Sequence, residues 1–142
     1  MRSEALENLV RIGKLASEPA SRTEFDGLLT SARHRLDDAE NEALNLESRF
    51  DLAYNAAHAL GLAALRWHGY RSGDRYLVFQ CLKHTVDLPN EQWRVLDEAH
   101  RKRNLAEYEG KVDVEMALVE AIIRVAREVE ARVGAFEPPA LD

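Results

Sequence analysis

The sequence has little cysteine, proline or glycine: one, four and seven residues among 142. Its single thiol, Cys81, cannot form an internal disulfide, which fits a reducing compartment. So few prolines and glycines disfavour a β-sandwich, a β-barrel or a low-complexity linker. No run of about 18 apolar residues occurs, and charged residues interrupt the first twenty positions, so we expect neither a membrane span nor a secretory signal. These absences predict a soluble, cytoplasmic protein.

The residues that are present favour a single helical domain over 1–142. Hydrophobic residues make up 46% of the chain and charged residues 31%, a balance typical of globular domains. A chain of this length removes roughly two thirds of its unfolded surface from water, which is enough for a real core. Neither strand-like alternation nor an internal repeat is evident. We therefore predict an all-α fold, an up-and-down four-helix bundle with an additional short N-terminal helix.

Apolar residues at helical spacing give the expected helices. The spacing predicts helices over 4–15, about 22–44, about 48–67, 75–86, 89–108 and 112–133. The second and third could be continuous, because no strong helix breaker lies between Ala43 and Ser48. Small residues form a stripe along the third helix, which permits close packing against a neighbour. Gly134 and two prolines follow the last helix, so residues 135–142 are expected to form a loose tail.

Charge is unevenly distributed along the chain. The formal net charge is −6, yet residues 49–106 carry nine basic and six acidic side chains and four of the five histidines. An anionic ligand would be drawn to this middle region, although helical surfaces also vary in charge by this much without any function. The pI of about 5.4 argues against nonspecific duplex binding, which is typical of domains with a pI above about 9.

Four polar residues near the end of the fifth helix form one candidate site. His100, Arg103, Asn104 and Tyr108 share about half of the helix surface. The guanidinium is a fixed fork of donors that matches phosphate oxygens, and the amide and phenol add directional hydrogen bonds. The pattern therefore predicts a phosphate-binding cluster. The alternative is a solvated helix end whose basic residues complement the helix dipole.

A second polar line flanks the small-residue stripe of the third helix. Asp51, Asn55 and His58 are spaced four and three residues apart and lie on one side of that helix. If the third and fifth helices pack side by side, this line could face the cluster around Arg103, and His58 or His100 could shuttle a proton. The alternative is that Asn55 and His58 make ordinary hydrogen bonds between helices.

Metal binding and nucleophilic catalysis have weak support in the sequence. Asp97 with His100 and Cys81 with His84 each supply only two ligands at helical spacing, fewer than a metal site requires. Cys81 lies in an apolar helical run, where a buried, inert thiol is expected. No serine has the setting of a nucleophile elbow, and no glycine-rich phosphate loop occurs. We therefore predict no metal and no cofactor.

Two short segments carry a resemblance to a known family. Residues 49–60 read RFDLAYNAAHAL, and residues 103–110 read RNLAEYEG. They resemble, respectively, the Tyr- and Ala-rich helix and the Arg-Asn-x-x-x-Tyr/His ending of the HEPN superfamily. This superfamily comprises small four-helix domains of prokaryotic toxin–antitoxin and defence systems, often encoded beside nucleotidyltransferases. Gly69-Tyr70-Arg71 also fits, and the resemblance covers about residues 45–130.

The resemblance implies a dimer and a role for Arg103. In members that cut RNA, an Arg, a following polar residue and a later His form a metal-independent site at the dimer interface. Arg103 would hold the phosphate and Asn104 would support it, but Tyr108 occupies the histidine position. A phenol with a pKa of about 10 is a poor general base at neutral pH, so cleavage would require His58 or His100 instead.

The leading hypothesis is a HEPN-like binding module, a homodimer that contacts a nucleotide, RNA or a nucleotidyltransferase-type partner through a basic pocket. The expected ligand-binding residues are Arg103, Asn104, Tyr108, Asp51, Asn55, His58 and His100. The alternative is a metal-independent endoribonuclease toxin with Arg103, Asn104 and His58 as its catalytic residues. A third reading is a purely structural or interaction protein. None of the three involves a membrane.

Overall fold

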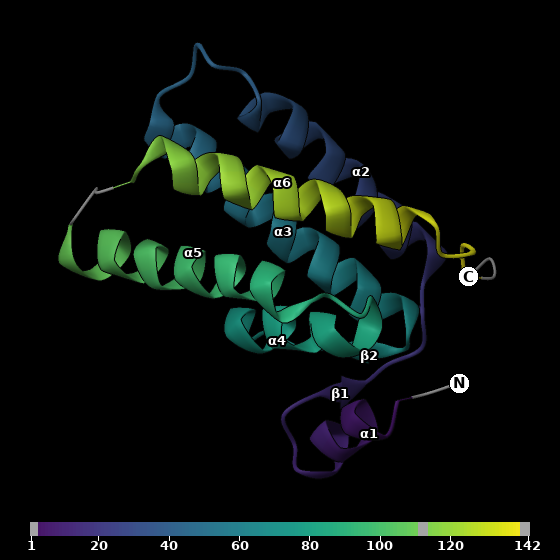
Figure 1. The fold of residues 1–142 in the computed structure, drawn as a ribbon. Helices are drawn as coiled ribbons and strands as arrows, with labels where there is room; N and C mark the ends of the chain where they lie inside the picture. The colour runs from purple at the N-terminus through teal and green to yellow at the C-terminus, as the bar shows by residue number, and fades with distance from the viewer. Residues whose placement is uncertain (1–2, 111–113, 140–142) are drawn as a thin grey trace.

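The computed structural model describes residues 3–110 and 114–139, and this part of the chain is mostly helical (Figure 1). In chain order the elements are α1 (Glu4–Arg11), β1 (Ala16–Ser17), α2 (Arg22–Ala39), α3 (Leu46–Trp67), β2 (Tyr70–Arg71), α4 (Arg75–Thr85), α5 (Asn90–Glu109) and α6 (Met116–Gly134). The predicted helical class is confirmed.

Local signals in the sequence explain several helix ends. The side chain of Ser21 accepts a hydrogen bond from the Glu24 backbone N–H at 3.2 Å and caps the start of α2. Asp74 caps α4 in the same way. Gly110 ends α5 with a φ of 67°, a left-handed conformation that glycine adopts readily. Capping side chains thus begin α2 and α4, and a glycine ends α5.

Three predicted helix boundaries differ from the structure by more than two residues. The first helix ends at Arg11 rather than near residue 15. The second helix ends at Ala39 rather than near residue 44, and α3 is a separate helix that begins at Leu46. Asn41 explains the break, because its side-chain oxygen accepts the Ala43 backbone N–H at 3.0 Å and its carbonyl accepts the Leu44 N–H at 3.1 Å. The last helix was predicted from residue 112 but begins at Met116, and residues 111–113 lie outside the described residues.

Helix α3 is the central element of the core. It contacts α2, α4, α5 and α6 (Figure 1). The predicted small-residue stripe is buried, and Gly61 marks the closest approach. A Cβ atom at Gly61 would lie 2.9 Å from Cγ1 of Val78 on α4. The absence of a side chain at this position therefore lets α4 lie directly against α3, which also fixes the place of the first residue of α4, Arg75.

The sequence shows no strand-like alternation, yet the structure contains two short strands. The two-residue strands β1 and β2 pair antiparallel, with Ala16 opposite Arg71 and Ser17 opposite Tyr70. Strands this short are too brief to show an alternation in the sequence. Their pairing depends on tertiary contacts, above all those of Arg66 at the end of α3, which is 1% exposed and donates to the carbonyl oxygens of residues 18, 19 and 70.

The N-terminal helix packs on a small separate core. Helix α1 contacts α4, and Figure 1 shows it at the edge of the molecule. This core consists of Leu6, Leu15, Leu65, Tyr70, Leu77, Val78 and Cys81. Cys81 is buried, as predicted, and burial raises the pKa of its thiol to about 11. The thiol is therefore protonated at neutral pH.

The start of the predicted tail contacts the end of α3. The Phe136 ring lies 4.8 Å from the Trp67 ring, centre to centre, and 5.9 Å from the ring of His68. Trp67 Nε1 also donates to the carbonyl oxygen of Glu137 at 2.5 Å. Residues 140–142 of this predicted tail lie outside the described residues. Among the described helices, none combines the length and the apolar character needed to cross a membrane.

Candidate functional site

Tyr54, at 0% exposure in the middle of α3, forms the floor of the candidate site. Two guanidinium groups lie over its ring. Cζ of Arg75, from the start of α4, is 5.8 Å from the ring centre, and Cζ of Arg103, from α5, is 5.3 Å from it. We call Arg75 and Arg103 the arginine pair. Three different helices thus bring two positive charges to one buried phenol.

A hydrogen-bond chain connects this phenol to α5. Nδ1 of His100 lies 3.0 Å from the Tyr54 hydroxyl oxygen, and Nε2 of the same ring lies 3.3 Å from Nδ2 of Asn104. An amide nitrogen can only donate, so Nε2 accepts and the ring proton is on Nδ1, which donates to the Tyr54 oxygen. His100 is therefore held as the neutral Nδ1–H tautomer.

Both histidines of the site are less basic than usual. Burial, followed by the charges of Arg75 and Arg103, lowers the pKa of His58 to about 4. Burial, followed by the charge of Arg103, also lowers the pKa of His100. His58 packs edge-on against Phe79, with ring centres 6.1 Å apart. The site at neutral pH therefore holds two neutral imidazoles and two guanidinium cations.

The positive charge of the arginine pair is only partly compensated. Arg75 donates to the neutral amide oxygen of Asn55 at 3.1 Å, and Asn55 donates in turn to the backbone oxygen of Asp51 at 2.8 Å. Arg103 forms an ion pair with Glu107 at 3.1 Å, and the Glu107 side chain is 48% exposed. Within the described part of the chain, this is the one carboxylate in ion-pair contact with either guanidinium. The pair keeps a net positive charge.

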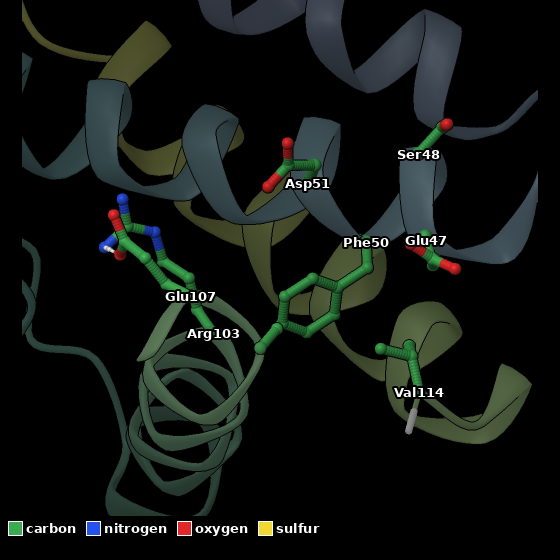
Figure 2. Close-up of a pocket in the computed structure, with 8 residues that line it drawn as sticks. Glu47, Ser48, Phe50, Asp51, Arg103, Glu107 and Val114 are labelled. Atoms are coloured by element: carbon green, nitrogen blue, oxygen red, sulfur yellow. Dashed lines mark ion pairs between the residues drawn. The ribbon is translucent and has the colours of Figure 1, made fainter. Parts of the chain in front are cut away.

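A cleft of about 470 Å³ opens beside Arg103, between the start of α3 and the end of α5. Figure 2 shows Arg103 and Glu107 together at one end, with Asp51 on the helix above them. The cleft is lined by Glu47, Ser48, Phe50, Asp51, Arg103, Ala106, Glu107 and Val114. Three carboxylates and a single arginine give this cleft a negative lining, so an anion is favoured between the two arginines rather than in the cleft.

Tyr108 does not join the arginine pair. Its side chain is 78% exposed and lines a separate groove of about 410 Å³ with Arg101, Asn104, Leu105 and Glu109. Five residues of an α-helix turn the chain by about 140° beyond a full turn, so Arg103 and Tyr108 project in different directions. Five of the predicted site residues lie together in the structure: Asn55, His58, His100, Arg103 and Asn104. Asp51 is connected to them because its backbone oxygen accepts a hydrogen bond from Asn55 and its side chain lines the cleft beside Arg103.

Sequence reasoning missed Tyr54 and Arg75. Tyr54 belongs to the apolar stripe of α3 and was therefore assigned to the core, but a buried tyrosine hydroxyl needs a polar partner. Its position next to Asn55, a residue of the predicted polar line, could have indicated that its hydroxyl belongs to the site. Arg75 offered none in its own helix, because its place over Tyr54 depends on how closely α4 approaches α3 at Gly61.

No protein-family model, curated protein or solved structure matches the chain. Within residues 3–110 and 114–139, no group of three or more His, Cys, Asp or Glu side chains is placed to hold a metal ion. The chemistry of the site is therefore argued from its own geometry.

Proposed function

We propose that this protein is a HEPN-like binding module that holds a phosphate group of RNA or of a nucleotide between Arg75 and Arg103. The observation that carries the proposal is the pair of guanidinium groups over the buried Tyr54 ring, where Glu107 is the one carboxylate among the described residues that forms an ion pair with either of them. Like charges repel, so placing them together costs stability unless an anion joins them. A phosphate offers oxygens to both guanidinium forks.

The surroundings support an anion site that is already organised. The Asn55 amide holds Arg75, and the chain of Tyr54, His100 and Asn104 fixes the floor. A ligand therefore meets donors that lose little further side-chain freedom on binding. The lowered pKa of each histidine keeps the charge of the site constant around neutral pH.

The family resemblance and the architecture belong to this proposal. The two HEPN-like segments supply Tyr54, Asn55 and His58 on one side and Arg103 and Asn104 on the other. We infer an up-and-down bundle of α2, α3, α5 and α6, supported by the contacts of α3 with the other three and of α6 with α2 and α5. A homodimer through α5 is supported by the exposed Leu105 and Tyr108 side chains on that helix, at 40% and 78% exposure.

One observation favours a second function, metal-independent RNA cleavage. His100 is neutral and lies one helical turn before Arg103 on α5. A neutral imidazole beside a phosphate-binding arginine can accept a proton from an attacking hydroxyl. Against this, Nε2 of His100 is occupied by Asn104, and Tyr108, at the family's histidine position, lies in the separate groove.

The test measures how much of a mixed-sequence RNA pool each protein retains, and whether it cleaves the RNA, in the presence of a chelator. Wild type is compared with Arg75→Ala, Arg103→Ala and a matched control, Arg124→Ala, at an exposed residue of α6, which carries none of the site residues. Hydrogen bonds to charged groups contribute about 1.5–3 kcal/mol, so each site variant should bind about 10- to 100-fold more weakly.

The expected result is retention without cleavage, lost in both site variants and kept in Arg124→Ala. Cleavage by the wild type that disappears in Arg103→Ala would favour the ribonuclease instead. Equal retention by all four proteins would contradict a phosphate site at the arginine pair.

A further inference from the structure

Aromatic rings continue from the arginine pair along the contact between α4 and α5. The ring of Tyr76 on α4 lies 5.1 Å from that of His100 and 6.2 Å from that of Trp93, centre to centre. The His100 ring is in turn 6.4 Å from that of Tyr54. We call Trp93, Tyr76 and His100 the aromatic strip. Each of the three side chains is partly exposed, so the strip belongs to the surface.

The strip has cations at both ends. Nζ of Lys83 lies 4.5 Å above the centre of the Trp93 ring, and the arginine pair lies beyond His100. Trp93 and Arg103 are ten residues apart on α5, a separation of about 15 Å along the helix axis. A single nucleotide held by its phosphate between the arginines cannot cover this length, whereas a short strand can.

One carboxylate interrupts the strip. Asp97 lies between Trp93 and His100 on α5, forms an ion pair with Arg101 at 3.6 Å and is 23% exposed. Burial, and then the hydrogen bond to Asp97, raise the pKa of Tyr76, so the phenol remains protonated. The ion pair with Arg101 and the hydrogen bond with Tyr76 thus offset the negative charge of Asp97. The middle of the strip is therefore suited to uncharged bases rather than to phosphates.

We propose that the aromatic strip is a base-stacking surface, which makes the ligand of this protein a single-stranded nucleic acid of at least two nucleotides. The inference rests on the proposed function, because the arginine pair anchors a phosphate at one end. Bases then stack along His100, Tyr76 and Trp93, and Lys83 meets a phosphate at the far end. Stacking on aromatic rings tolerates any base, so the strip binds without strong sequence preference.

The chain offers an internal probe, because it has two tryptophans and only one lies in the strip. Trp67 packs against Phe136 at the end of α3. In Trp67→Phe the remaining fluorescence comes from Trp93, and in the matched variant Trp93→Phe it comes from Trp67. Both proteins are titrated with an octamer of uridylate and, separately, with uridine monophosphate.

We expect the octamer to quench the fluorescence of Trp67→Phe and to leave that of Trp93→Phe unchanged. Tyr76→Ala should bind the octamer up to about tenfold more weakly, since losing one stacking ring has roughly this effect, and Trp93→Phe, which keeps a smaller ring, should weaken binding less. Their affinity for uridine monophosphate should not change. Melting curves show whether each variant is folded.

Two results would contradict base stacking on the aromatic strip and still support phosphate binding at the arginine pair. One is octamer binding that is lost in Arg103→Ala but leaves Trp93 fluorescence unchanged. The other is equal affinity of the wild type for the octamer and the monophosphate. Failure of the proposed function looks different, because both ligands would then bind wild type and Arg103→Ala alike, or not at all.

Discussion

Two arginine clusters contact α3, and they differ in how their charge is balanced. At the end of α3, Arg66 and Arg71 face Glu18 and Glu24, two cations against two carboxylates. Arg66 is 1% exposed and also donates to three backbone oxygens. Over the middle of α3, Arg103 of the arginine pair has one half-exposed carboxylate partner, Glu107, and Arg75 is held by the neutral amide of Asn55.

The comparison separates a structural arginine from a ligand-binding one. A buried guanidinium with all its donors matched contributes to the stability of the native state, and nothing remains for a ligand. A guanidinium over an aromatic floor, with little opposing charge, keeps donors for an anion. We therefore expect substitutions in the first cluster to change stability and substitutions in the second to change binding.

The largest expected effect is the loss of stability when Arg66 is removed from the cluster at the end of α3. Arg66→Ala removes one of the two arginine partners of Glu24 and the donor to three backbone oxygens, so the free energy of unfolding should fall by about 3–5 kcal/mol. Urea unfolding followed by circular dichroism measures this. Arg103→Ala is the control and should change stability by less than about 1 kcal/mol. Equal destabilisation by the two variants would contradict the distinction between a structural and a ligand-binding arginine.

The next effect concerns the helix contact that places Arg75. Gly61→Ala puts a Cβ atom 2.9 Å from Val78 Cγ1, a contact that a stiff β-branched side chain relieves poorly. We expect a loss of about 1–3 kcal/mol in stability, measured by thermal unfolding. The folded variant should also bind RNA more weakly, because α4 carries Arg75. The control is Gly27→Ala, where the added Cβ meets nothing within 4 Å.

Substitution of one glutamate in each cluster should separate the two roles, because Glu107→Gln should change binding and Glu24→Gln should change stability. Glu107→Gln removes the carboxylate beside Arg103 and should raise RNA affinity about two- to fivefold, the result of roughly 0.5–1 kcal/mol of lost charge compensation. Filter binding at low salt measures it. Weaker binding by Glu107→Gln would mean that the carboxylate orients Arg103 for the ligand rather than competing with it.

Glu24→Gln should instead lower stability and leave binding unchanged. The hydrogen bond from Arg71, and then contacts with Arg66, hold the pKa of Glu24 below its usual value despite its partial burial. A lowered native pKa stabilises the fold above the unfolded-state pKa of about 4.3, and this contribution is lost as the pH falls through the native pKa. Unfolding at pH 7 and at pH 3 should show a smaller difference between the variant and wild type at pH 3 than at pH 7.

The smallest expected effect is that of pH on binding. With the pKa of His58 at about 4 and that of His100 also lowered, both rings are mostly neutral from pH 6.5 to 8. RNA affinity should therefore change by less than about twofold over this range and increase only at lower pH, where protonation adds positive charge. A steep fall in affinity between pH 6.5 and 8 would show that a charged histidine takes part in binding.

Patterns within single helices made much of this arrangement predictable. Ser21 and Gly110 marked true helix ends, and the spacing of His100, Arg103 and Asn104 placed them together on α5. Packing between helices was harder to anticipate. Arg75 reaches the site only because Gly61 admits α4, and the β1–β2 pair depends on a buried arginine that looks ordinary in its own helix.

The most direct test of the account measures affinity and stability on the same variants. Wild type, Arg66→Ala and Arg103→Ala are titrated with labelled uridylate octamer at a temperature where all three are folded, and each is then unfolded in urea. The account predicts that Arg103→Ala loses at least tenfold in affinity with nearly unchanged stability, and that Arg66→Ala loses stability but keeps its affinity. Unchanged octamer affinity in a folded Arg103→Ala would contradict it.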